Sequence, residues 1–176
     1  AVGVSKAVEQ CEAHGQKVAQ WVHDFLAAGN ETFYTVSDGV RSCYNPGTKA
    51  YEVVPGQEGR IKLAYLGEEK VVWMNAGVTL HDLGDGILNV GFHTKMNTIG
   101  AEILQGLNHA FDIAEDATTP WRGVVISNEG GNFSAGANVG MVFMLAVEQE
   151  YEELDYAVRM FQNTVMRARH SSIPVV

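Results

Sequence analysis

The sequence predicts an α/β fold from about residue 71 onward, preceded by a helix and a small β-hairpin region. Two observations lead to this prediction. After residue 71, apolar runs follow the order strand, strand, helix, strand, glycine-rich loop, helices and strand. Before residue 71, short aromatic runs are interrupted by turn-forming pairs such as Asp38-Gly39 and Pro55-Gly56. We therefore treat residues 1–70 and 71–176 as two parts of the chain.

Composition narrows the classes of function. The hydrophobic fraction of 46% is ordinary for a globular protein. The net charge of -9 argues against binding to nucleic acid or to an anionic membrane surface. A small anionic ligand is still allowed, because it needs only one or two local cations. Cys11 and Cys43 lack metal-ligand spacing and are expected to be reduced thiols. No histidine spacing indicates a metal site.

The sequence shows no pattern typical of a targeting signal. There is no signal peptide pattern and no run of eighteen apolar residues, so a cytoplasmic location is expected. The chain opens with Ala-Val-Gly and closes with Ile-Pro-Val-Val. We expect both ends to be cut points inside a longer protein.

The first part is expected to hold one helix and one hairpin. Apolar residues recur at helical spacing over residues 5–28, and Gly29-Asn30 is a typical helix stop. Gly15 interrupts the pattern, so two shorter helices are the alternative. A hairpin is predicted over residues 42–54. No catalytic constellation is visible in this part.

The second part begins with the strongest hairpin signal in the chain. Its predicted elements are strands at 78–83 and 87–93 around Gly84-Asp85-Gly86, a helix at 99–114, a buried strand at 122–127, helices at 141–147 and 151–169, and the start of a strand at 174–176. Asn97 or Thr98 could cap the first of these helices, with Glu102 in its first turn.

The most informative segment is the loop that follows the buried strand at 122–127. A glycine pair turns the chain there, and Phe133 is expected to anchor the loop in the core. The small residues 134–137 then bring nearly bare backbone to the surface just before a helix. N–H groups at a helix N-terminus carry partial positive charge, so this arrangement suits an oxyanion that forms during a reaction.

A family resemblance becomes specific at this loop. Phe133-Ser-Ala-Gly-Ala-Asn138 resembles the F-S-A-G-A-D signature of the crotonase (enoyl-CoA hydratase/isomerase) superfamily. Thr94-Lys-Met-Asn97 lies where that family has its K-A-x-N segment. The resemblance covers residues 78–176 and implies the N-terminal half of a crotonase-like ββα spiral core. Asn138 replaces the family's Asp, a change expected to be minor because both residues cap helices.

The resemblance also implies roles for individual residues. The N–H of Ala137 would be one oxyanion-hole donor to the acyl thioester. The residues implied to bind the substrate or CoA are Lys95 and Met96 along the channel, Ala135 near the adenine end, and Gly136, Asn138 and Val139. In this family the second donor and the catalytic glutamates follow the next strand, after Val176. No metal or cofactor is expected in this segment beyond acyl-CoA as substrate.

A second resemblance concerns residues 20–34. They resemble the tail of the dehydrogenase helical domain in bacterial fusions of 3-hydroxyacyl-CoA dehydrogenase with enoyl-CoA hydratase. Residues 1–70 would then be a connecting region and residues 71–176 the first half of a hydratase domain. NAD would bind elsewhere in the parent chain, since no G-x-G-x-x-G follows a strand here. Expected partners are the rest of the parent chain and further copies of it.

The sequence allows more than one interpretation of the parent reaction and of several residues. The parent reaction would be hydration of a trans-2-enoyl-CoA, with isomerisation, thioester hydrolysis or a non-catalytic CoA-binding scaffold as alternatives. Lys95 could equally be a solvated lysine. Ser134 lacks the first glycine of G-x-S-x-G and is expected to be structural. Glutamates at 148, 150, 152 and 153 are expected to form a solvated face at a helix start.

Overall fold

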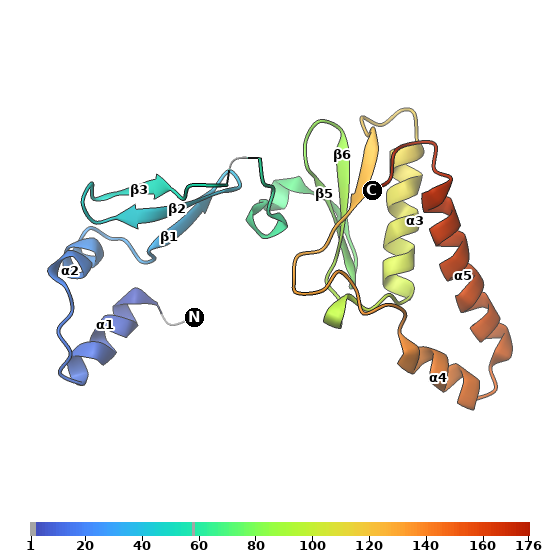
Figure 1. Ribbon diagram of the computed structural model, residues 1–176, viewed down its shortest axis with the longest axis horizontal. Helices are drawn as coiled ribbons and strands as arrows, with labels where there is room; N and C mark the ends of the chain where they lie inside the picture. Colours follow the sequence, from blue (N-terminus) through green and yellow to red (C-terminus); the bar gives the residue numbers. More distant parts are fainter. Residues whose placement is uncertain (1–2, 58) are drawn as a thin grey trace. The chain divides into compact units, whose positions relative to one another are not determined.

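The structure is a computed structural model that describes residues 3–57 and 59–176 (Figure 1). It divides into two compact units, the first ending at Tyr65 and the second comprising Leu66–Val176. Each unit has its own secondary structure and its own core, and we describe them separately.

The first unit begins with two short helices in place of one long one. Helix α1 spans Val4–Ala13 and α2 spans Gln20–Ala27. Gly15, between them, has a φ of 72°, which an α-helix cannot accommodate, so the two-helix alternative is confirmed. Gly29 has a φ of 82° and ends the second helix as predicted.

A three-stranded antiparallel sheet follows these helices. Its strands are β1 (Tyr34–Ser37), β2 (Val40–Asn45) and β3 (Ala50–Val53), in that order. The predicted hairpin at 42–54 is confirmed as the β2–β3 pair. The fully buried Phe25 ring lies 5.0 Å from the Phe33 ring and 4.7 Å from the Tyr44 ring, so an aromatic cluster joins α2 to the sheet.

The second unit is built on a four-stranded sheet in the order β4-β5-β6-β7. Its strands are β4 (Val71–Met74), β5 (Val78–Asp82), β6 (Ile87–Phe92) and β7 (Gly123–Ile126). The hairpin β5–β6 and the buried strand β7 were predicted, whereas β4 was not. β6 and β7 run parallel, and α3 (Ala101–Glu115) connects them.

Helix α3 packs against one face of this sheet, with α5 (Tyr151–Arg169) beside it (Figure 1). The core includes residues of β5, β6, β7 and α3: Val78, Leu80, Leu88, Val90, Ile103, Phe111 and Val124. Gly106 allows the close approach of helix and sheet, because a β-carbon there would lie 2.8 Å from the side chain of Val78.

The chain end returns to the sheet. Val175 forms a parallel bridge with Val124 of β7, as expected for the predicted strand start at 174–176. Helices α4 (Val139–Val147) and α5 also match their predicted ranges closely. Polar contacts attach α5 to α3: the Arg167 guanidinium lies 3.0 Å from the Glu115 carboxylate and 2.8 Å from that of Asp112.

The predicted cap of α3 is wrong. The helix begins after Gly100, which provides no side-chain cap, whereas Lys95–Asn97 form a separate 3₁₀ turn. The Asn97 side chain instead donates to the carbonyl oxygens of Asn132 and Phe133, and Thr98 donates to the Lys95 carbonyl. The side chains near this helix start therefore hold loops together. Glu102 lies in the first turn as predicted.

Candidate functional site

The loop between β7 and α4 is held by side-chain hydrogen bonds to its backbone. The Asn128 side chain donates to the Phe133 carbonyl at 2.6 Å, and Asn97 donates to the same oxygen at 3.2 Å. The Ser134 hydroxyl donates to the Asn97 carbonyl at 2.6 Å and accepts from the Gly136 N–H at 3.0 Å. Ser134 therefore has structural partners on both sides, and the loop backbone is fixed by polar contacts.

These contacts explain why the predicted anchoring role of Phe133 is wrong. Its side chain is 57% exposed, and its ring centroid lies 6.1 Å from that of Phe92. The loop does not need an apolar anchor, because three side-chain amide and hydroxyl groups already bind its main chain. Phe133 thus lies at the surface of the loop and contacts the end of β6.

Ala137 lies at an isolated parallel bridge with Ile99. The Ile99 N–H donates to the Gly136 carbonyl at 2.8 Å, and the Asn138 N–H donates to the Ile99 carbonyl at 3.1 Å. In parallel pairing, a residue whose two neighbours make these bonds has its own N–H directed away from the partner strand. None of the described residues accepts a hydrogen bond from the Ala137 N–H.

Helix α4 begins immediately after this bridge. Asn138 is its N-cap, and the Asn138 side-chain oxygen accepts the Met141 N–H at 3.3 Å. Gly136 has a φ of 83°, a conformation in which a β-carbon is strained, so this position favours glycine. The free N–H of Ala137 is consequently placed beside the positive end of the α4 dipole.

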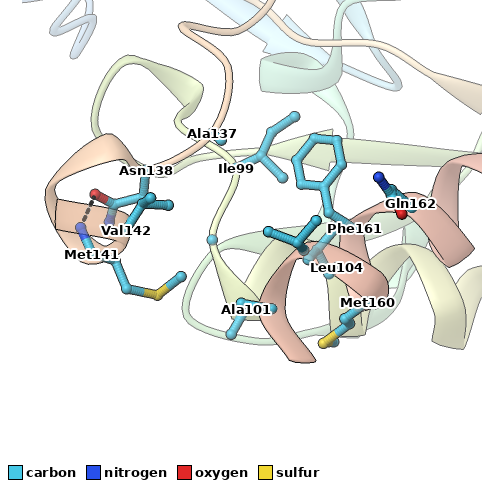
Figure 2. Close-up of a pocket in the computed structure, with 13 residues that line it drawn as sticks. Ile99, Ala101, Leu104, Ala137, Asn138, Met141, Val142, Met160, Phe161 and Gln162 are labelled. Carbon is cyan, nitrogen blue, oxygen red and sulfur yellow. Dashed lines mark hydrogen bonds between the residues drawn. The ribbon is translucent and has the colours of Figure 1, made fainter. Parts of the chain in front are cut away.

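A cavity of about 280 Å³ lies next to Ala137. Figure 2 shows Asn138, Met141 and Val142 on one side of it, and Phe161 and Gln162 on the other. Its lining residues are Ile99, Gly100, Ala101, Leu104, Ala137, Asn138, Met141, Val142, Ala157, Val158, Met160, Phe161 and Gln162. Carbon atoms dominate this lining, and none of these side chains titrates. The cavity is suited to an apolar group.

The remaining predicted residues lie around this loop but outside the cavity lining. The 3₁₀ turn at Lys95–Asn97 is joined to the loop by the Ala135 N–H, which donates to the Met96 carbonyl at 3.1 Å. Met96 is 61% exposed and has a φ of 57°. Lys95 is exposed, and none of the described carboxylates pairs with its ammonium. Val139 is 73% exposed on α4.

Sequence reasoning missed the wall contributed by α5. The cavity is also lined by Val158, Phe161 and Gln162 of α5, which is separated from the loop in sequence by the whole of α4. The apolar period of 151–169 predicts a buried stripe but not the element that this stripe faces. Among the described residues, no group of three or more His, Cys, Asp or Glu side chains could hold a metal ion.

Comparison with known proteins adds relatives of this chain. No protein-family model matches it. It is 36% identical, in an alignment of 177 positions that covers the whole chain, to a Bacillus subtilis (strain 168) protein named as a probable 3-hydroxyacyl-CoA dehydrogenase. It is 25% identical over 129 residues to a Rickettsia prowazekii protein named as a fatty acid oxidation complex trifunctional enzyme. The match covers 22% of the Bacillus subtilis protein and 17% of the Rickettsia prowazekii protein. The chain thus spans about a fifth of the length of these relatives.

The fold of about half of this chain matches that of a solved structure. An enoyl-CoA hydratase from Polaromonas sp. JS666 aligns with a TM-score of 0.50 and 24% identity over 56% of this chain and 38% of that chain. No helix among the described residues is long and apolar enough to cross a membrane. About half of this chain thus shares the fold of part of an enoyl-CoA hydratase. The chain is also similar to longer bacterial proteins, one named as a 3-hydroxyacyl-CoA dehydrogenase and one as a fatty acid oxidation complex trifunctional enzyme.

Proposed function

We propose that this chain is the thioester-binding segment of a longer multifunctional β-oxidation enzyme that hydrates trans-2-enoyl-CoA. The names of the two relatives and the fold of the second unit support this proposal. Residues 71–176 would form the first half of the hydratase domain. Residues 1–70 would connect it to a 3-hydroxyacyl-CoA dehydrogenase portion that binds NAD outside this chain.

The observation that carries the proposal is the free N–H of Ala137. It belongs to a residue that also lines an apolar cavity, and it precedes the α4 N-terminus. A thioester carbonyl that accepts this N–H would gain stabilisation as negative charge develops on its oxygen. Removing one such donor typically costs about 100- to 1000-fold in rate. The acyl group would then occupy the cavity.

The CoA moiety would lie along the neighbouring backbone. Lys95 and Met96 would line the channel, Ala135 would contact the adenine end, and Gly136, Asn138 and Val139 would complete the site. Two features support this placement: the Met96 carbonyl and the Ala135 N–H already join the two segments, and the exposed ammonium of Lys95 could approach a phosphate.

Proton transfer would come from residues outside this chain. Because no lining side chain titrates, we expect the isolated chain to bind thioesters without turning them over. The same observation favours a second candidate function, a non-catalytic CoA-binding module with the same cavity. Isomerisation and thioester hydrolysis would differ in the residues supplied by the rest of the parent enzyme.

Calorimetry with a matched ligand pair tests the proposal. Butyryl-CoA has the thioester carbonyl, whereas its S-butyl thioether analogue lacks it. We expect butyryl-CoA to bind about five- to tenfold more tightly, the effect of one hydrogen bond. Ala137→Pro removes the N–H and should abolish that preference, whereas Ala137→Gly keeps the N–H and should retain it.

Two results would count against the proposal. Equal affinities of the wild-type chain for both ligands would remove the assignment of Ala137. The absence of binding by either ligand would exclude thioester binding by this chain.

A further inference from the structure

Helix α4 and the first half of α5 carry a group of exposed apolar side chains. We define the α4–α5 apolar surface as Val139, Phe143, Met144 and Val147 of α4 with Tyr151 and Val158 of α5, each at least 45% exposed. We infer that this surface is a packing interface for the remaining part of the hydratase fold. The inference rests on the proposed function only for the identity of that partner.

The composition of α4 requires a partner. Its nine residues, Val-Gly-Met-Val-Phe-Met-Leu-Ala-Val, include no polar or charged side chain, and none of them is buried. The helix contacts α5, and its two half-buried residues are Val142 and Leu145. A helix that is apolar all round is normally buried in a larger protein or in a membrane. α4 is thus suited to burial on its remaining sides as well.

A membrane does not fit this surface. Nine residues extend about 14 Å as a helix, less than half the thickness of the hydrocarbon core. A helix that lies on a membrane surface needs a cationic polar face, which α4 lacks. The residues after it include Glu148, Glu150, Glu152 and Glu153, which would be repelled by anionic lipid. The chemistry of the surface therefore indicates a protein partner.

The matched hydratase favours the rest of that fold as the partner. The alignment with the Polaromonas sp. JS666 hydratase covers 38% of that chain, so most of that fold lies outside the match. The second unit also continues its sheet through Val175, which pairs with Val124 of β7. A second copy of this chain would be the competing occupant.

Thiol labelling measures whether this surface becomes covered. Cys11 and Cys43 are first replaced by Ser, and one reporter, Phe143→Cys or Tyr156→Cys, is then introduced. Tyr156 is 68% exposed on α5 but lies outside the defined surface. Labelling rates are compared between the chain alone and a chimera in which it continues into the segment that follows its match in the Bacillus subtilis relative.

We expect labelling of Phe143→Cys to slow at least tenfold in the chimera and labelling of Tyr156→Cys to stay within twofold. No slowing at Phe143→Cys, or equal slowing at both sites, would overturn the inference. Labelling of Phe143→Cys in the chain alone that slows as protein concentration rises would assign the surface to a second copy instead.

A second measurement needs only this chain. Binding of the apolar dye ANS should fall by more than half in the double variant Phe143→Lys with Met144→Lys. Tyr156→Lys should bind as much dye as the wild type. Unchanged dye binding in the double variant would overturn the inference. Neither readout uses a CoA ligand, so their failure is distinguishable from failure of the proposed function.

Discussion

Helices α3 and α4 differ in burial, and the difference is the reverse of what their compositions would suggest. α4 consists entirely of apolar residues and glycine, yet none of its residues is buried. α3 includes Glu102, Asp112 and Glu115, yet seven of its residues are buried between the sheet and α5. The apolar residues of α3 are concentrated on one face, which the sheet covers. Burial thus depends on the element that packs against a helix.

The largest effect is expected from truncating one aromatic side chain on each helix. Phe111 of α3 is fully buried, so Phe111→Ala should lower the free energy of unfolding by about 3–5 kcal/mol. Phe143 of α4 is 63% exposed, and Phe143→Ala should change it by less than about 0.5 kcal/mol. Urea unfolding followed by circular dichroism measures both. Similar losses would show that α4 is packed within this chain.

A smaller effect is expected from adding one methyl group to a glycine of each helix. In α3, a β-carbon at Gly106 would lie 2.8 Å from Val78, so Gly106→Ala should cost about 1–3 kcal/mol through overpacking. In α4, the nearest atom to such a carbon at Gly140 is the Asn138 side-chain oxygen at 3.3 Å. Gly140→Ala should be neutral or stabilising, because alanine favours a helix.

A double variant separates the steric cause at Gly106 from other causes. Adding Val78→Ala to Gly106→Ala should cost less than the sum of the two single variants, since the smaller side chain leaves room for the methyl group. Additive losses in the same urea unfolding assay would contradict the steric explanation.

The smallest effect concerns pH. Hydrogen bonds from the Ser171 hydroxyl and the Arg167 guanidinium lower the pKa of Glu115, the last residue of α3. A lowered carboxyl pKa stabilises the fold above the unfolded value near 4.5 and loses that contribution as the pH falls below it. Glu115→Gln should thus lower stability at pH 7 by up to about 1 kcal/mol and flatten its decline in acid.

Glu148, which follows α4, provides the matched control for this measurement. None of the described cations pairs with it, so Glu148→Gln should change the free energy of unfolding at pH 7 by less than about 0.5 kcal/mol. Unfolding by urea between pH 3 and pH 7 compares the two variants. An equal loss at pH 7 in both variants, or an unchanged pH profile for Glu115→Gln, would contradict the assignment.

Much of the secondary structure could be predicted because its signals are local. Glycines at positions 84 and 86 have positive φ and turn the β5–β6 hairpin, and helical periodicity marks α5 over its full length. The position of β4 was not predictable, because its four residues form a strand only through pairing with β5. The cap of α3 was mispredicted because Asn97 instead binds the loop at Asn132 and Phe133, remote in sequence.

The candidate site also has features that the sequence predicts and features that depend on the tertiary structure. The small residues around Ala137 and the family resemblance follow from the sequence, since they depend on neighbouring positions. The free N–H of Ala137 depends on pairing with Ile99, and the cavity depends on α5 supplying Phe161. Such contacts arise between segments that are far apart in the chain and therefore leave no local pattern. Turns and helices are set by short-range chemistry, whereas the direction of one N–H group and the wall it faces depend on long-range packing.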